Sequence, residues 1–237
     1  SYPAGHENVI AVASTAADDT RAYYSNYGDW VDVAAPGGDA YKDTMILSTV
    51  PLVGTISNPS GYDSIQGTSM ACPYVSGLAA LILSEAPTLN SEQVREVIRL
   101  SADDLGVPGF DIIYGYGRVN AYNALSWAST VATDMTAPLI LDGPIASDSA
   151  ISTGSITITW QTDELSTSKV YYGDSIPLAS SFTQPGYSTY HVVVLTNLEL
   201  NVPYYVAIES KDLAGNSVFD NNNGAFYYFM LVPPTFG

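Results

Sequence analysis

The chain of 237 residues has few basic side chains and a single cysteine. Seven Lys and Arg residues stand against 24 Asp and Glu residues, so the formal net charge at pH 7 is −17. We expect no nucleic-acid partner, because a surface of this charge repels phosphates. The lone cysteine, Cys72, excludes an internal disulfide framework. Its place in an apolar helical pattern predicts a small buried side chain.

Long apolar runs are also missing, although apolar residues make up 46% of the chain. No run reaches the roughly 18 residues that a membrane-spanning helix needs, so we expect no transmembrane segment. Short apolar runs in a chain of this length suffice for the core of one large domain or two modest ones. The abundance of Tyr, Thr, Ser and Asn beside few lysines indicates a secreted or cell-surface protein.

One serine stands where an extended stretch, residues 62–66, turns into a helix. The apolar residues that follow fall on one helical face, at Val75, Leu78, Ala79 and Ile82. Ser69 would therefore lie at the positive end of this helix, among backbone N–H groups that have no helical partner. That place suits a nucleophile whose reaction creates an oxyanion. A helix cap is the other role open to this serine.

Residues 67–77, GTSMACPYVSG, resemble the nucleophile motif of the subtilisin-like serine proteases. Other segments resemble family segments in the same order, at residues 8–13, 24–37 and 115–121. Tyr74 departs from the pattern, since the family usually has histidine there, at a helical position outside the catalytic triad. The resemblance implies an α/β subtilisin-like fold, a mostly parallel sheet with helices, of which residues 1–132 would be the C-terminal part.

The resemblance also implies a reaction. Ser69 would attack a peptide carbonyl after a histidine takes its proton, and the Ser69 N–H together with an asparagine side chain would hold the oxyanion. In the family the acid, the histidine and this asparagine all precede the matched segments, and neither His6 nor His191 stands in the histidine's place. We therefore expect this chain to be inactive alone. With the N-terminal half of the protease domain as partner, it would cut protein or peptide substrates.

Two further sites are implied by the resemblance. The pocket for the substrate side chain before the cut would be bordered by Ser1, Tyr2, Pro3 and Ala4, with a structural loop as the alternative. The carbonyls of Glu7 and Val9 and the Asp32 carboxylate would hold a structural Ca²⁺, because calcium prefers oxygen ligands; an ordinary turn aspartate is the alternative. The chemistry itself requires no cofactor. The acidic pairs at 18–19 and 103–104 are expected on solvated faces.

Secondary structure around the serine follows from local patterns. Short apolar strands, as in a parallel sheet covered on both faces, are expected at residues 9–13, 31–34 and 45–49. Pro87 should end the serine-bearing helix. Asn90 and Gln93 make a capping-box pattern for a helix to about Leu100. A short helix is expected over residues 120–129.

The composition changes at residues 133–136, which we interpret as a linker. Beyond it, alternating strands separated by turn residues indicate a β-sandwich over residues 137–237. This part resembles a bacterial fibronectin type III module, in ITWQTDE, SKVYYG and DLAGN. Leu198 and Tyr204 fit that family's tyrosine corner, although Leu200 and Asn201 replace its usual Pro and Gly. We expect a binding or spacing role here, without a metal or acid–base cluster.

Two classes of function remain open. The first is a secreted serine endopeptidase, of which this chain carries the C-terminal half and an accessory sandwich. The second is a non-catalytic surface or assembly protein that uses a subtilase remnant and an Ig-like module for contacts. The presence of Asp, His and Asn in the family's upstream motifs would separate the two.

Overall fold

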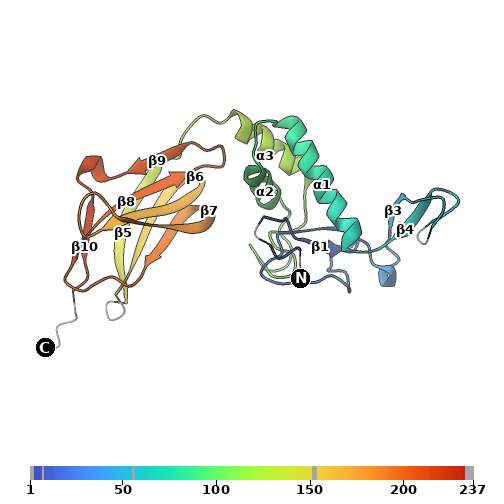
Figure 1. Cartoon of the computed structure of the whole chain (residues 1–237), viewed down its shortest axis with the longest axis horizontal. Coiled ribbons are helices and arrows are strands. Elements are labelled where there is room, and N and C mark those ends of the chain that lie inside the picture. Colours follow the sequence, from blue (N-terminus) through green and yellow to red (C-terminus); the bar gives the residue numbers. More distant parts are fainter. Residues whose placement is uncertain (1–2, 7, 55–56, 151–153, 233–237) are drawn as a thin grey trace. The chain divides into compact units, whose positions relative to one another are not determined.

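The structure is a computed structural model that describes residues 3–6, 8–54, 57–150 and 154–232 (Figure 1). The chain divides into two compact units, Ser1–Thr133 and Asp134–Gly237. No helix in the described part of the chain is long and apolar enough to cross a membrane.

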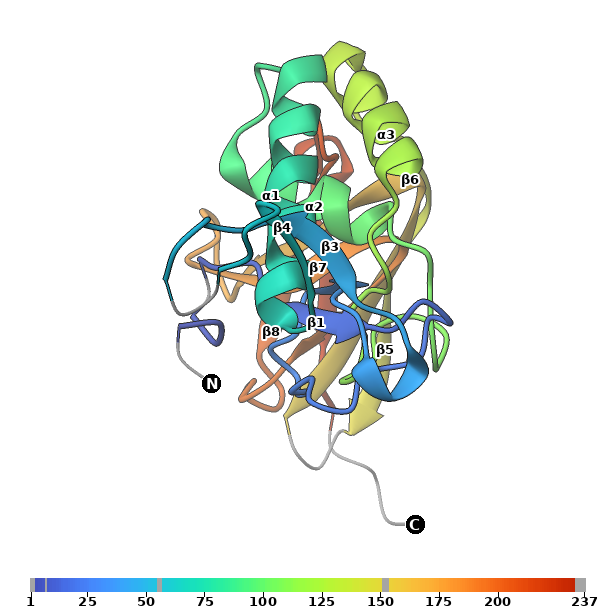
Figure 2. The same cartoon turned by 90° about the vertical axis from the view of Figure 1, so that its right-hand side faces the viewer.

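The first unit combines three helices with short strands. The helices are α1 (Thr68–Glu85), α2 (Ser91–Leu100) and α3 (Ala121–Thr133). The strands are β1 (Val12–Thr15), β2 (Val33–Pro36), β3 (Ile46–Thr49) and β4 (Tyr62–Ile65), and η1 (Ala40–Lys42) is a 3-10 turn. β1 and β2 pair in parallel, with Val12 opposite Val33. Helices α1 and α3 lie side by side (Figure 1, Figure 2).

The third predicted strand differs from expectation. β3 pairs with β4 in an antiparallel ribbon, with Ile46 opposite Ile65, and does not join the β1–β2 pair. Its side chains are mostly exposed, and Leu47 has 69% of its surface accessible. The prediction of a parallel strand covered on both faces is wrong here, because an apolar run alone does not reveal which strand it will pair with.

Helix α1 buries three of the four residues of the predicted apolar face, and the fourth, Ala79, is half-buried. Val75, Leu78 and Ile82 are buried, where α1 contacts β1, β2, α2 and α3. Cys72, predicted to be buried, is exposed. The helix is apolar on all sides, and the described residues cover only one of its faces, so its other face carries accessible apolar side chains such as Leu81, 52% exposed.

The other helices follow the sequence patterns. Helix α2 begins at the predicted capping box, in which the Asn90 side chain accepts from the backbone of Gln93 and the Gln93 side chain accepts from the backbone of Asn90. Helix α1 ends at Glu85, two residues before Pro87. Helix α3 runs to Thr133 and is thus longer than predicted, because α3 packs on α1 and α2.

The described residues of the second unit form a six-stranded antiparallel sheet. Its strands are β5 (Ile140–Ala150), β6 (Ser155–Gly173), β7 (Ser180–Leu195), β8 (Pro203–Lys211), β9 (Ser217–Asp220) and β10 (Tyr227–Met230). They are ordered β10-β8-β6-β5, with β7 on β6 and β9 on β8. A 3-10 turn, η3 (Asn222–Gly224), precedes β10. The long β6 pairs with β5 and β7 through its first half and with β7 and β8 through its second.

The core of the second unit contains Trp160 and His191. Trp160 is 1% exposed, donates from Nε1 to Ser210 Oγ at 2.8 Å, and stacks on the imidazole at 4.7 Å. Apolar residues from β6, β7, β8 and β10 surround the pair. Near the end of this core the Tyr204 hydroxyl accepts from the Glu199 backbone N–H at 3.1 Å, which is the contact expected of a tyrosine corner.

Candidate active site

Ser69 is the second residue of α1 and does not cap it. The capping position belongs to Gly67, whose φ of 152° and ψ of 159° favour glycine, and no side-chain hydrogen bond caps the helix. The Ser69 side chain is exposed, and its Oγ makes no hydrogen bond to any residue that the structure describes. The capping alternative is therefore wrong. The first turn of α1 instead presents the Ser69 hydroxyl at the N-terminal end of the helix, toward which the backbone N–H groups point.

The turn before Ser69 is held by the loop after β2. Gly67 N–H donates to the Gly37 carbonyl at 2.9 Å, and the Tyr24 hydroxyl donates to the same carbonyl at 2.8 Å. A Cβ atom on Gly37 would lie 2.6 Å from Gly67 O and 2.0 Å from Ser14 Oγ. Only glycine fits this close approach. The Pro36-Gly37 segment of the motif pattern thus supports the turn that carries the serine.

Ser69 opens onto a hollow of about 270 Å³. Its other lining residues come from β3 and the first turns of α1: Ile46, Leu47, Ser48, Met70, Pro73 and Tyr74. Tyr74, the residue that departs from the family pattern, therefore borders the hollow that Ser69 faces. An extended, mostly exposed strand flanks the serine on this side, which is a surface that a peptide strand is able to follow.

Neither histidine of the chain lies at this hollow as the structure describes it. His191 is fully buried in the second unit, where Nε2 contacts Thr162 Oγ1 and Nδ1 contacts Ser168 Oγ, each at 2.8 Å. Burial lowers the pKa of His191 to about 4. His6 belongs to a turn before β1, in which its N–H donates to Pro3 O at 3.1 Å.

The structure describes two of the four residues predicted to border the substrate pocket. Ser1 and Tyr2 lie outside the described residues. Pro3 and Ala4 form the turn that includes His6, and the lining of the Ser69 hollow, over the described part of the chain, does not include them. Their role in substrate binding stays a prediction.

Asp32, a predicted calcium ligand, lies beside two arginines of α2. The side chain is buried; its Oδ2 accepts from the Ala11 N–H at 2.6 Å, and its Oδ1 accepts from Arg99 Nε at 2.9 Å and also contacts Arg99 Nη2. Arg95 Nη2 lies 3.5 Å from the same oxygen and donates to the Val9 carbonyl at 3.2 Å. Glu7 lies outside the described residues. The two predicted ligands that are described already face cations.

The acidic pairs at 18–19 and 103–104, expected on solvated faces, each contribute one aspartate to an ion pair. Arg118 contacts Asp19 at 2.5 Å and Asp103 at 2.6 Å. Hydrogen bonds from Asn120 and Arg118 lower the pKa of Asp103. Sequence patterns missed this bridge because its partners are distant along the chain and meet only in the fold.

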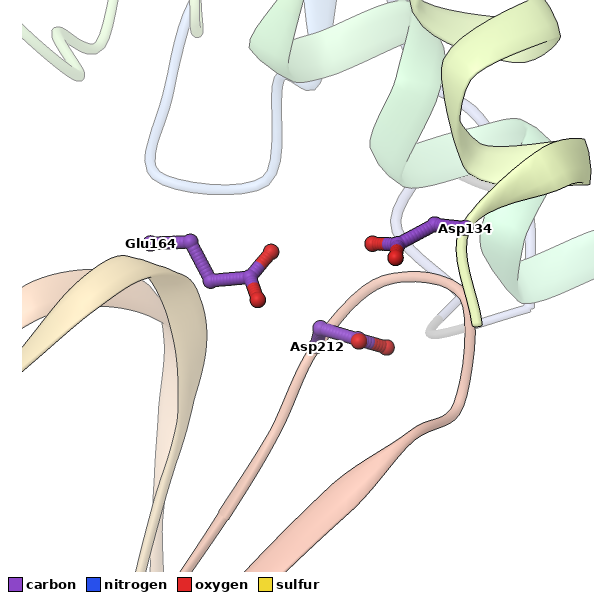
Figure 3. Close-up of side chains that lie close together, drawn as sticks. All are labelled: Asp134, Glu164 and Asp212. Carbon is purple, nitrogen blue, oxygen red and sulfur yellow. The ribbon is translucent and has the colours of Figure 1, made fainter. Parts of the chain in front are cut away.

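The second unit contains a group of three carboxylates that the sequence did not reveal (Figure 3). Oxygen atoms of Asp134, Glu164 and Asp212 lie within 4.8 Å of one another. Asp212 is buried and accepts from the backbone of Gly215 at 2.6 Å and of Asn216 at 2.8 Å. Burial, together with the neighbouring acids, raises the pKa of Glu164. The sequence analysis expected no cluster of titratable groups in this unit, and it missed this one because three distant segments bring the carboxylates together.

Comparisons with known proteins concern the first unit. Residues 1–117 match the model of the subtilase family. A thermophilic serine proteinase from Bacillus sp. (strain AK1) is 42% identical over 125 residues, 53% of this chain and 27% of that protein. The halolysin-like extracellular serine protease Nep from Natrialba magadii is 39% identical over 126 residues, 53% of this chain and 20% of that protein.

The crystal structure of a lanthipeptide protease is 36% identical in sequence, covers 53% of this chain and 43% of that one, and has a TM-score of 0.48. The chain spans less than a third of the length of the two relatives above. The motif around Ser69, the turn that supports it and the sequence matches agree. Over residues 1–117, this chain matches the subtilase family and is similar to its serine proteases.

Proposed function

We propose that this chain is part of a subtilisin-type serine endopeptidase in which Ser69 is the nucleophile. The observation that carries the proposal is the exposed Ser69 hydroxyl on the first turn of α1, which bonds to no residue that the structure describes and lies beside a hollow flanked by an extended strand. Attack by Ser69 Oγ on a peptide carbonyl creates a negative oxygen, which the Ser69 N–H at the positive end of the helix would stabilise.

The proton of Ser69 needs a base from outside the described residues, since neither histidine of this chain lies at the hollow. We propose that the N-terminal half of the protease domain supplies the histidine, the aspartate and the oxyanion asparagine. The uncovered apolar side of α1 and the exposed β3–β4 ribbon support this, because apolar surface of this kind is normally buried against a partner. Without that half, only residual catalysis is expected.

A non-catalytic surface or assembly protein is the second candidate, and it is favoured by the same absence of a histidine at the hollow.

The second unit is, in our proposal, a fibronectin type III-like module with a binding or spacing role. The contact between Tyr204 and Glu199 and the all-antiparallel pairing support that assignment. We also propose an extracellular location, because the relative Nep is an extracellular protease and this chain has few lysines.

A fluorophosphonate probe tests the nucleophile directly. It reacts with activated serines, so the full gene product that contains this chain should be labelled at Ser69, and Ser69→Ala should abolish labelling. Ser76→Ala is the matched control, because Ser76 lies on the same helix and donates only to the Cys72 carbonyl. Residues 1–237 alone should remain unlabelled. Absence of label on Ser69 in the full gene product would favour the non-catalytic candidate.

A further inference from the structure

A buried carboxylate joins helix α2 to the two parallel strands of the first unit. Asp32 is 3% exposed and stands directly before β2. Its Oδ2 accepts from the backbone N–H of Ala11, directly before β1. A carboxylate removed from water requires a cation or several hydrogen bonds to compensate its charge. The identity of that cation therefore decides what holds this side of the unit together.

Two arginines of α2 supply the positive charge. Arg95 and Arg99 are four residues apart, so they lie on one face of the helix. Arg99 donates from Nε and Nη2 to Asp32 Oδ1, a geometry in which the planar guanidinium faces the carboxylate. Arg95 reaches the same oxygen at 3.5 Å and donates to the Val9 carbonyl at 3.2 Å.

Both arginines also face a carboxylate of their own helix. Arg99 Nη1 donates to Glu96 Oε1 at 2.6 Å, and Arg95 Nη1 lies 3.9 Å from Glu92 Oε2. Burial lowers the pKa of Arg99, but its bonds to Asp32 and Glu96 raise that pKa by a larger amount. The pKa of Arg99 therefore lies above its ordinary value. A divalent cation added at Asp32 would face two guanidinium groups at close range, where like charges repel strongly.

The ring of Tyr116 covers the cluster on another side. The centre of the ring lies 5.4 Å from the Arg99 guanidinium carbon. The backbone N–H of Tyr116 donates to the main-chain carbonyl of Asp32 at 2.8 Å. A Cβ atom on Gly115 would lie 2.2 Å from that same carbonyl. The backbone on this side is thus in close contact with the main chain of Asp32.

We propose that the guanidinium groups of Arg95 and Arg99 occupy the place that a structural cation would hold at Asp32, so that this site is independent of calcium. The arginines connect α2 to the residues that precede β1 and β2, as a bound ion would connect two loops. Calcium that stabilises the protein elsewhere does not act through Asp32.

The test compares melting temperatures of the full gene product in excess calcium and in excess EDTA. Asp32→Asn should lower the melting temperature by roughly 10 °C in both buffers, because it leaves two buried guanidinium groups without their partner. The difference between the buffers should be the same for Asp32→Asn and the unmodified protein. A calcium-dependent increment that Asp32→Asn abolishes would overturn the proposal, and calcium bound at other sites cancels in this comparison.

Arg99→Gln provides a second, independent variant in case Asp32→Asn does not fold. It should lower the melting temperature by a similar amount in both buffers, since it removes the main cation from a buried carboxylate. Arg118→Gln is the matched control, because Arg118 also bridges two carboxylates, Asp19 and Asp103, but on a more exposed surface. If Arg99→Gln costs no more than Arg118→Gln, the guanidinium is not the cation that matters.

Discussion

Acid should destabilise the second unit through His191. Its ring is 0% exposed and stacks on Trp160 with an interplanar angle of 11°. The tautomer follows from its neighbours. Thr162 Oγ1 donates to the Glu164 carbonyl and so accepts from His191 Nε2–H, which leaves Nδ1 to accept from Ser168 Oγ. The neutral ring is thus fully satisfied, and a second proton would place a charge in the core.

The size of the effect follows from the shift in pKa. Burial lowers the pKa of His191 from 6.5 to about 4, so between these values the unfolded chain binds a proton that the folded chain does not. The stability that the neutral His191 contributes to folding is therefore present in full above pH 6.5 and is lost as the pH falls toward 4. A shift of this size corresponds to about 3 kcal/mol at most, or 1.4 kcal/mol per pH unit.

Two measurements check this expectation. The chain has only two histidines, His6 and His191, so NMR titration of the imidazole C–H signals resolves them readily. The His191 signal should not shift until the pH nears 4. Urea unfolding of the second unit at pH 7 and pH 4.5 should show a loss of stability that His191→Phe largely removes. A His191 titration midpoint near 6.5 in the folded protein would refute the reasoning.

Three other outcomes are expected. A fragment of residues 137–237 should melt cooperatively, and Trp160→Ala should lower its free energy of unfolding by about 3–5 kcal/mol, because the ring is buried and bonded to Ser210; an unfolded fragment, or an unchanged stability, would contradict the sandwich. A fragment of residues 1–132 should aggregate through the uncovered side of α1, and cooperative unfolding of a soluble fragment would count against this. Gly37→Ala in the full gene product should slow fluorophosphonate labelling at least tenfold, since the new Cβ would displace the turn before Ser69. Gly77→Ala is the control, because a Cβ there meets open space. An unchanged labelling rate in Gly37→Ala would show that the turn does not position the serine.

Local patterns in the sequence were sufficient wherever neighbouring residues decide the outcome. The helix that bears Ser69, the capping box of α2 and the alternation of β6 depend on contacts within a few residues, so periodicity and turn chemistry predicted them. The serine motif likewise occupies one continuous segment. It therefore indicated Ser69 as the candidate nucleophile, and carried the subtilase resemblance, before any fold was known.

Only the tertiary structure decided the features that depend on distant partners. Nothing near Asp32 in the sequence indicates that Arg99 will meet its carboxylate, and the resemblance pointed instead to calcium. The group of Asp134, Glu164 and Asp212 is likewise assembled from three separate segments. Cys72 was misplaced for the same reason: an apolar helix indicates that burial is favourable, but which face is covered depends on the elements packed against it.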